Sequence, residues 1–394
     1  MLVKENELPN MPDILKEICL LFKLRHKKTT YRMILNMTIN KMAFAFCSKR
    51  IQFKEYDKLG YPNWYAMIFA PSGCGKDRID SELEKYVFFA FKQWFDASAK
   101  KYEEKCIMLI ENDAREKFGD LYSRKARLYI KEETNKLRKL VFQVYNWTAE
   151  GLFEEAKARK KWGLGAINIK ITEFAKYFLN LKVEDKQFFS ITLNAFDSKI
   201  PSKCIKNDNR EEDIEDVPFN SLLMSDYSSF EAPRARQELL NELQIGLARR
   251  ENVTFIPSIK FEIDTDAETI VKNNYLFFEQ VEVIGKQFEI IFNNLNNKAI
   301  YEIPAEVLTE LENYKLKSEL LCNEYDKEIL RKEILDRQYK AVKLAKIFAV
   351  LNQKDNIVTI TDVTQAISVI EYLSADFKKF VNYRPNKSDS YDEL

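Results

Sequence analysis

Residues 63–76 read Asn-Trp-Tyr-Ala-Met-Ile-Phe-Ala-Pro-Ser-Gly-Cys-Gly-Lys, an apolar run that breaks into a glycine-containing turn and ends in Gly75-Lys76. A phosphate-binding loop (P-loop) needs a preceding strand, small residues whose backbone N–H groups can face phosphates, and a lysine for their charge. Residues 65–69 predict the strand, and the helical pattern from Arg78 predicts a helix N-terminus beside the phosphates. The predicted nucleotide-binding residues are Pro71, Ser72, Gly73, Cys74, Gly75, Lys76, Asp77 and Arg78.

The loop departs from the strict pattern G-x-x-x-x-G-K-[ST] at two positions. Ala70 stands at the first glycine, and Asp77 replaces the hydroxyl residue that ligates magnesium. A carboxylate is a ligand for hard cations, but it also repels phosphate. Asp77 is therefore a candidate magnesium ligand, and it weakens the case for hydrolysis more than the case for ATP binding. The alternative is an ordinary strand–turn–helix with a capping aspartate.

Composition predicts a soluble, mainly helical chain. The 394 residues allow two or three packing units, and nine glycines and ten prolines are few for this length. Lys plus Arg total 62 against 61 acids, so net charge gives no sign of a nucleic-acid or membrane partner. His26 is the only histidine and the six cysteines are scattered, which argues against zinc sites of the usual spacing and histidine-based catalysis. With no signal-type apolar block, a cytoplasmic protein with free thiols is expected.

The chain divides into three predicted parts around an α/β core of the RecA-like or AAA-like P-loop NTPase type. Residues 1–60 predict a helical N-terminal cap, and residues 61–257 the ATPase core. Within the core, residues 78–145 predict a long, charged helical hairpin, interrupted near Gly119. Residues 258–394 predict a C-terminal helical region that serves as a lid or a subunit contact. Its amphipathic stretches are 266–297, 303–352 and 361–383, the last with Thr361 as its N-cap.

Two further predicted strands supply candidate catalytic residues. Residues 165–172 alternate as a strand does and end at Glu173, where a Walker B strand would place the glutamate that polarises the attacking water. Residues 218–226 predict the next strand, whose polar end offers Ser225 and Asp226 as sensors of the γ-phosphate. In parallel sheets, ligands bind beyond the carboxyl ends of the strands, which is where these residues fall.

Arg249 lies in an arginine pair just before a short strand at 252–256. An arginine at such a turn can reach the nucleotide of a neighbouring subunit as an arginine finger, although most arginine pairs are solvated surface.

Basic residues for contact with nucleic acid occur in two places, the polar segment 202–216 and the predicted hairpin. Acidic residues are interleaved with them, which favours a solvated face over a binding surface. Likewise, an aromatic stripe at helical spacing in residues 86–95 favours packing over base stacking. The basic candidates are Lys203, Lys206, Arg210, Arg124, Lys125, Arg127, Lys131, Lys136, Arg138 and Lys139.

The order of these motifs resembles that of the ATPase family named domain of unknown function 3987, the motor half of primase-helicases of phages and mobile elements. The resemblance covers residues 10–380. It rests on Pro71-Ser-Gly-Cys-Gly-Lys76 and the charged hairpin, then on Trp147-Thr-Ala-Glu-Gly-Leu152, Ile171-Thr-Glu-Phe174, Leu193-Asn-Ala-Phe-Asp197 and Gly246-Leu-Ala-Arg249. It closes with Tyr339-Lys-Ala-Val-Lys-Leu-Ala345 and Ile360-Thr-Asp-Val-Thr-Gln-Ala-Ile-Ser-Val-Ile-Glu-Tyr372.

The resemblance implies a ring-forming, ATP-dependent DNA helicase or translocase for phage or mobile-element replication, with ATP and magnesium as cofactors. Lys76 would bind phosphates, Glu173 would activate water, Arg249 would act in a neighbouring subunit, and Lys343 would be a second sensor. Thr172 and Asp77 depart from the family at the magnesium positions, and a carboxylate lost at one reappears at the other.

The implied partners are further copies of the chain in a ring such as a hexamer, single-stranded DNA, and a separate primase or polymerase. No membrane partner is expected, and a phage origin would place the protein in the cytoplasm of a bacterial host. The alternative is a catalytically weakened nucleotide-binding or scaffold subunit of a phage replication or transcription assembly.

Overall fold

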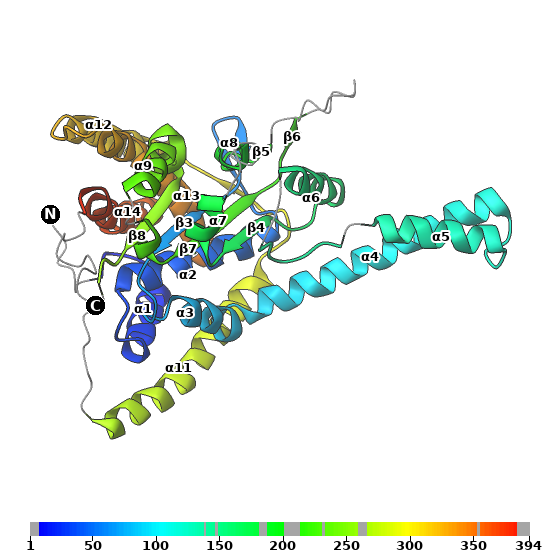
Figure 1. Ribbon diagram of the computed structural model, residues 1–394, viewed down its shortest axis with the longest axis horizontal. Helices are drawn as coiled ribbons and strands as arrows, with labels where there is room; N and C mark the ends of the chain where they lie inside the picture. Colours follow the sequence, from blue (N-terminus) through cyan, green and yellow to red (C-terminus); the bar gives the residue numbers. More distant parts are fainter. Residues whose placement is uncertain are drawn as a thin grey trace, which may run out of the picture.

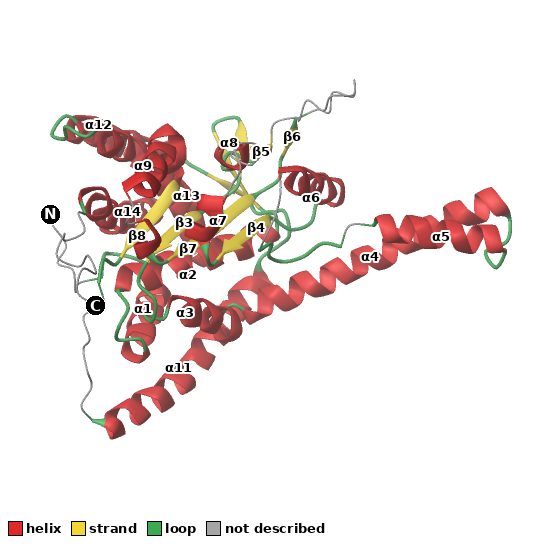
Figure 2. Cartoon of the chain, viewed as in Figure 1, coloured by secondary structure: helices red, strands yellow, loops and turns green. Residues whose placement is uncertain are grey.

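The computed structural model shows a parallel sheet between layers of helices (Figure 1, Figure 2). Among the described residues, no helix is long and apolar enough to cross a membrane. The structure describes residues 8–137, 139–145, 149–180, 187–200, 213–230, 233–258, 266–352 and 355–383.

The main sheet has four parallel strands, β3 (Tyr65–Phe69), β4 (Ile167–Ile171), β7 (Phe219–Ser225) and β8 (Glu251–Phe255), in the order β4-β7-β3-β8. All four strands predicted for the core, at 65–69, 165–172, 218–226 and 252–256, are present near the expected residues. All five residues of β3 are buried, as expected for a strand covered on both faces. Because the strands are parallel, their carboxyl ends lie at one edge of the sheet. An α/β core is therefore confirmed.

Side chains alternate between the two faces of β3, and each face meets a different helical layer. Ala66 and Ile68 share a core with α2 (Tyr31–Ser48), which is buried along almost its whole length. Met67 and Phe69 share a second core with α6 (Ala149–Trp162), α7 (Phe174–Asn180), α8 (Gln187–Ala195) and α9 (Pro233–Glu242). The apolar residues of one short strand thus join both layers.

Helix α2 is part of the core, although the sequence predicts it within an N-terminal cap. Its Asn36 and Asn40 side chains donate to the backbone carbonyls of Asn252 (2.6 Å) and Ser221 (2.7 Å) on β8 and β7. These bonds from the two amide nitrogens fix the helix against the sheet. The helix before it, α1 (Asp13–Arg25), packs on α2 and on α11 (Ala267–Asn294).

A small second sheet corrects the prediction that residues 1–60 and 258–394 are wholly helical. Strand β1 (Gln52–Glu55) pairs with β2 (Lys58–Gly60) and, in parallel, with β9 (Ile300–Glu302). Strands of three or four residues are too short to establish a period in the sequence. The partner strand β9 also lies far away in the chain, so no local signal announces the pairing.

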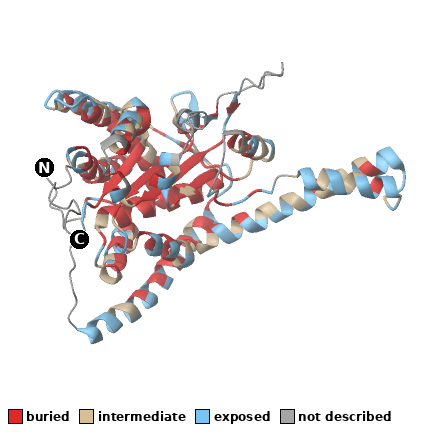
Figure 3. Cartoon of the chain, in the orientation of Figure 1, coloured by how far each residue is buried: buried red, intermediate tan, exposed pale blue. Residues whose placement is uncertain are grey.

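The predicted hairpin projects from the body of the molecule and is largely exposed (Figure 1, Figure 3). It consists of α4 (Phe89–Phe118) and α5 (Arg124–Lys136), and α4 ends at Gly119, whose φ of 74° suits glycine. Helix α3 (Lys76–Glu82) and the π-turn η1 (Leu83–Val87) lead into it. The aromatic stripe packs in the core at the base of α4, as predicted, with Phe91 and Phe95 buried.

The C-terminal region contains α11, α12 (Ala305–Cys322), α13 (Glu328–Asn352) and α14 (Ile360–Asn382). Thr359, not Thr361, is the N-cap of α14: its hydroxyl accepts from the Asp362 N–H, and the Asp362 carboxylate accepts from the Thr359 N–H. The remaining elements are β5 (Lys199–Ile200), β6 (Ile214–Glu215), η3 (Tyr227–Phe230), η4 (Leu243–Leu247) and α10 (Ala248–Arg250).

Candidate nucleotide-binding site

The loop between β3 and α3 has the backbone shape that its glycines predict. Gly73 has φ 83° and Gly75 has φ 89°, a left-handed conformation that other L-residues avoid. The Ala70 N–H donates to the Ser225 carbonyl (3.0 Å), so the loop leaves the sheet at its carboxyl edge. Gly75 precedes the first turn of α3, where no described side chain caps the helix N–H groups. Those groups remain available for an anion.

The ammonium of Lys76 is held inside the loop. Its Nζ donates to the carbonyl of Ala70 (3.2 Å), and the residue is 8% exposed. Cys74 is also buried in this turn. The positive charge thus lies over the loop's first residue, and among the described residues its one hydrogen-bond partner is a neutral carbonyl.

Asp226 supports the loop from the end of β7. One carboxylate oxygen accepts from both the N–H and the hydroxyl of Ser72, each at 2.9 Å, and the other accepts from Ser228. Partial burial opposes ionisation of Asp226, but the hydrogen bonds from Ser228 and Ser72 hold its pKa below its usual range. The carboxylate is therefore ionised and engaged with the loop.

Ser225 connects β7 to the start of α7. Its hydroxyl accepts from the Ala175 N–H (3.2 Å) and donates to the Asp226 carbonyl (3.1 Å). Both sensor candidates therefore lie at the loop's edge of the sheet, where they hold backbone segments in place.

Glu173 lies in the turn between β4 and α7 and is exposed. Its carbonyl accepts from Tyr177 N–H (3.0 Å), whereas its carboxylate bonds to no residue that the structure describes. Strand β7 separates β4 from β3, so two strand spacings, roughly 10 Å, separate the ends of β4 and β3. Glu173 and Lys76 thus both lie at the carboxyl ends of the strands. Ser225, at the end of β7, lies between them.

Arg249 lies at the opposite end of the strands from the loop, just before the amino end of β8. Its guanidinium forms a two-point ion pair with Asp336 on α13, at 2.6 Å and 3.0 Å. A five-residue strand spans roughly 15 Å, so this side chain is remote from the predicted P-loop of its own chain.

Lys343 also lies toward the amino ends of the strands. Its Nζ donates to the carbonyl of Tyr61 (3.0 Å), a residue that precedes β3, and lies 5.1 Å from the centre of the Phe196 ring. Burial lowers the pKa of Lys343 to about 8. This second-sensor candidate is not brought together with Lys76 and Glu173 in one chain.

A buried group of charges behind α3 was not predicted. Asp80 on α3 pairs with Lys41 of α2 (2.7 Å) and with Lys170 of β4, and Glu84 pairs with the same two lysines. Lys41 and Asp80 are fully buried. The group therefore ties the P-loop helix to α2 and to the strand that leads to Glu173.

A second unpredicted group surrounds Glu82 on α3. Its carboxylate contacts His26 Nε2 (2.7 Å), Arg25 (3.1 Å) and Arg78 (3.0 Å). Glu82 and Asp80 look like ordinary helix-surface acids in the sequence, because their partners lie in α1, α2 and β4. Only the spacing of Asp80 and Glu84, four residues apart on one helix face, hinted at a shared role.

Asp77 lies in the first turn of α3 and is exposed, so its carboxylate fits a ligand for a hard cation. Among the described residues, no group of three or more His, Cys, Asp or Glu side chains is arranged to hold a metal ion. A magnesium ion held here would need the oxygens of a bound nucleotide as well.

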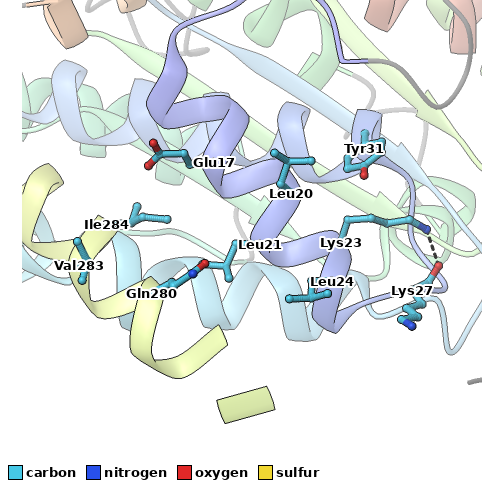
Figure 4. A pocket seen from close by; sticks show the side chains of 10 residues that line it. All are labelled: Glu17, Leu20, Leu21, Lys23, Leu24, Lys27, Tyr31, Gln280, Val283 and Ile284. Carbon is cyan, nitrogen blue, oxygen red and sulfur yellow. Dashed lines mark hydrogen bonds between the residues drawn. The ribbon is translucent and has the colours of Figure 1, made fainter. Parts of the chain in front are cut away.

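A separate pocket of about 750 Å³ lies between α1 and α11 (Figure 4). Leu20, Leu21 and Leu24 face Val283 and Ile284 across it, so its lining is mainly apolar. The ammonium of Lys23 at its rim donates to the Lys27 carbonyl. No residue of the P-loop lines this pocket, and it lacks the chemistry of a phosphate site.

The hairpin candidates for contact with nucleic acid lie on or beside α5, where acids accompany them: Lys136 pairs with Glu133 (2.6 Å) and Lys139 with Glu103 (3.4 Å). The predictions for Arg138, Thr148, Lys203, Lys206 and Arg210 lie outside the described residues.

Comparisons with known proteins add no relative. No family model matches this sequence, and a search of curated proteins finds no significant match.

Proposed function

We propose that the loop from Ala70 to Lys76 binds the phosphates of ATP and that the chain is the ATPase motor of a DNA helicase or translocase. One observation carries the proposal: two left-handed glycines and a buried lysine lie at the carboxyl edge of a central parallel strand, directly before a helix. A bound phosphate would replace the neutral carbonyl of Ala70 with a charged partner for Lys76.

Glu173 is the proposed general base. Glu173 follows the carboxyl end of β4, at the same end of the sheet as the loop, and this position supports the role. Its carboxylate is exposed, and no described residue engages it. A carboxylate free of other partners is available to orient and polarise a water molecule toward the γ-phosphate.

Asp77 is the residue that would hold magnesium, and the ion would neutralise charge on the phosphates when bound. The expected Walker B aspartate is Thr172 in this chain, so Asp77 would replace a carboxylate lost there. The double variant Asp77→Ser with Thr172→Asp tests this exchange, because it restores the usual arrangement. Compensation predicts retained ATP turnover in the double variant and loss in each single variant.

We propose that Arg249 acts on the nucleotide of a neighbouring copy, as in a ring. Arg249 and the predicted P-loop lie at opposite ends of the strands of one sheet, so they cannot meet within a single chain. Mixing Lys76→Ala with Arg249→Ala chains tests this arrangement. If Arg249 acts between copies, mixed assemblies regain turnover that neither variant has alone.

The further proposal is a role in phage or mobile-element replication, together with single-stranded DNA and a separate primase or polymerase. It rests on the motif order of the domain of unknown function 3987 family and on basic residues along the projecting α5. Because acids accompany those residues, the turnover assay includes arms with and without single-stranded DNA.

The first experiment is ATP turnover with magnesium, with and without single-stranded DNA, for the native chain and for Lys76→Ala and Glu173→Gln. DNA-stimulated turnover that both changes abolish supports the motor. The second candidate function is a nucleotide-binding scaffold, favoured by the aspartate at position 77 and by the ion pair that engages Arg249. ATP binding by the native chain without turnover, with or without single-stranded DNA, would support the scaffold.

A further inference from the structure

Helix α11 carries a row of apolar side chains on the face that points away from the molecule. Its buried residues pack against α1, η1 and α4, and the helix forms an outer edge of the molecule (Figure 1). On the far side from the buried residues lie Leu276, Val283 and Ile290, which are 37%, 55% and 60% exposed. Because they are seven residues apart, about two helical turns, they form one straight stripe.

The spacing of this stripe is typical of helices that pair with another helix. Single exposed apolar residues are ordinary, but a row at every seventh position is the pattern of a coiled-coil contact. The apolar surface also extends beyond α11, because Leu20 of α1 is 47% exposed and lines the same pocket as Val283 (Figure 4). A helix laid along α11 would therefore cover apolar side chains from both elements.

The polar residues beside the stripe are complementary to themselves. On one flank, Glu279 lies four residues before Val283 and Lys286 lies three residues after it. Both are exposed, and neither forms an ion pair with another described residue. On the other flank, Gln280 and Gln287 lie three residues before and four residues after Val283. If a second α11 runs antiparallel with its Val283 opposite this one, each glutamate faces a lysine and the glutamines face each other.

We propose that α11 pairs with α11 of a second copy of the chain, antiparallel and around a twofold axis at Val283. Leu276 of each copy then packs against Ile290 of the other, and the Glu279–Lys286 contact occurs twice. In a parallel pair, the charged flank of each helix would face the glutamine flank of the other, and this complementarity would be lost.

This contact is of a different kind from the contact in the proposed ring. A twofold contact uses the same surface on both copies, whereas a ring joins two different surfaces of neighbouring copies, as the role proposed for Arg249 requires. The pairing of α11 therefore does not depend on the nucleotide site, and it can be tested without nucleotide.

The experiment is sedimentation velocity of the full chain over a range of concentrations, for the native chain, Val283→Glu and Val283→Lys. Either variant brings two like charges together at the twofold axis and should weaken self-association about a hundredfold. An equimolar mixture of the two variants places unlike charges there and should regain association. Since Val283 is exposed, circular dichroism should show that both variants stay folded.

A second set of variants tests the direction of pairing. Lys286→Glu places glutamates opposite each other twice and should weaken association about tenfold, whereas Glu279→Lys combined with Lys286→Glu should restore the native affinity. A parallel pair predicts little change in either variant. Leu320→Glu on α12 is the matched control, because Leu320 is 72% exposed but lies outside α11, and it should leave association unchanged.

Three results would overturn the inference. A native chain that stays monomeric at every concentration would mean that a helix of another protein, not a second copy, covers the stripe. Association that Val283→Glu leaves unchanged would assign it to another surface, with the proposed ring still standing. Failure of the mixed variants to associate would exclude a twofold axis at Val283. Absence of ATP turnover would overturn the proposed function and leave this contact intact.

Discussion

Replacing Lys41 with methionine tests the buried charges that hold α3, the helix after the predicted P-loop. Lys41 is fully buried on α2, and its ammonium lies 2.7 Å from Asp80 and also pairs with Glu84. With Lys170, the group contains two ammonium groups and two carboxylates, so its charges balance. Methionine keeps a similar length and removes only the charge and its hydrogen bonds.

The expected loss is large, because the carboxylates stay buried. After Lys41→Met, Asp80 and Glu84 share Lys170 alone, which leaves one uncompensated negative charge. Breaking a buried pair by removal of one partner costs about 3–5 kcal/mol. A typical protein has only about 5–15 kcal/mol of net stability, so this variant should unfold at a much lower urea concentration.

Urea unfolding followed by circular dichroism measures the change, with Lys117→Met as the matched control. Lys117 makes a similar contact with Asp113 (2.7 Å), but both side chains are about half exposed. The control should leave the free energy of unfolding unchanged within error, because exposed ion pairs contribute little. The double variant Lys41→Met with Asp80→Asn restores the charge balance and should recover part of the loss.

Equal stability of Lys41→Met and Lys117→Met would refute the reasoning. It would mean that the charges near Asp80 are solvated, and that α3 is held by other contacts. If the stability loss of the double variant equals the sum of the losses of the two single variants, the charge-balance argument is refuted, although the burial of the charges is not.

Three further variants test the pH dependence and the loop. Burial opposes ionisation of Glu84, yet Lys41 and Lys170 hold its pKa at about 2. The ionised carboxylate therefore stabilises the fold above pH 4.5, and this contribution is lost as the pH falls toward 2. In urea, the native chain should be more stable than Glu84→Gln by at most about 3 kcal/mol, and this difference should close over that range. Burial raises the pKa of Glu251 to about 8. The fold is therefore most stable below pH 4.5, where the acid is protonated, and this stability is lost as the pH rises to 8. Between pH 5 and pH 8, the free energy of unfolding of Glu251→Gln should rise on the order of 4 kcal/mol relative to that of the native chain, and no rise would contradict the burial of Glu251. Gly73→Ala forces a left-handed alanine in open space and should lower the free energy of unfolding by about 1–2 kcal/mol, whereas Gly60→Ala, at a φ that alanine tolerates, should not.

Local chemistry explains which features the sequence could predict. The loop was found because strand, glycines and lysine are contiguous in residues 65–76, and each has a conformational reason to be there. The strands near Glu173 and Ser225 were found from alternation and apolar runs. Their order in the sheet was not, because hydrophobic periodicity identifies a strand without naming its neighbour.

Non-local contacts explain what the sequence could not provide. Lys41, Asp80 and Glu82 look like solvated charges, since burial of a charge depends on partners that only the fold supplies. His26 entered the sequence analysis only as the single histidine, which argued against histidine-based catalysis. It precedes the P-loop by almost fifty residues, and the turn after α1 brings its ring against Gly75.

The ion pair between Arg249 and Asp336 does not by itself exclude a role for Arg249 between copies. The Arg249 side chain is 49% exposed, whereas that of Asp336 is only 7% exposed. Transfer of Arg249 to the phosphates of a neighbouring copy would leave a buried carboxylate without this partner, which is costly, so the new contact would have to offset that cost. Lys76 differs, because its buried ammonium has only a neutral carbonyl to leave. The two proposed phosphate ligands therefore differ in what they would leave behind: Lys76 a neutral carbonyl, and Arg249 a buried carboxylate.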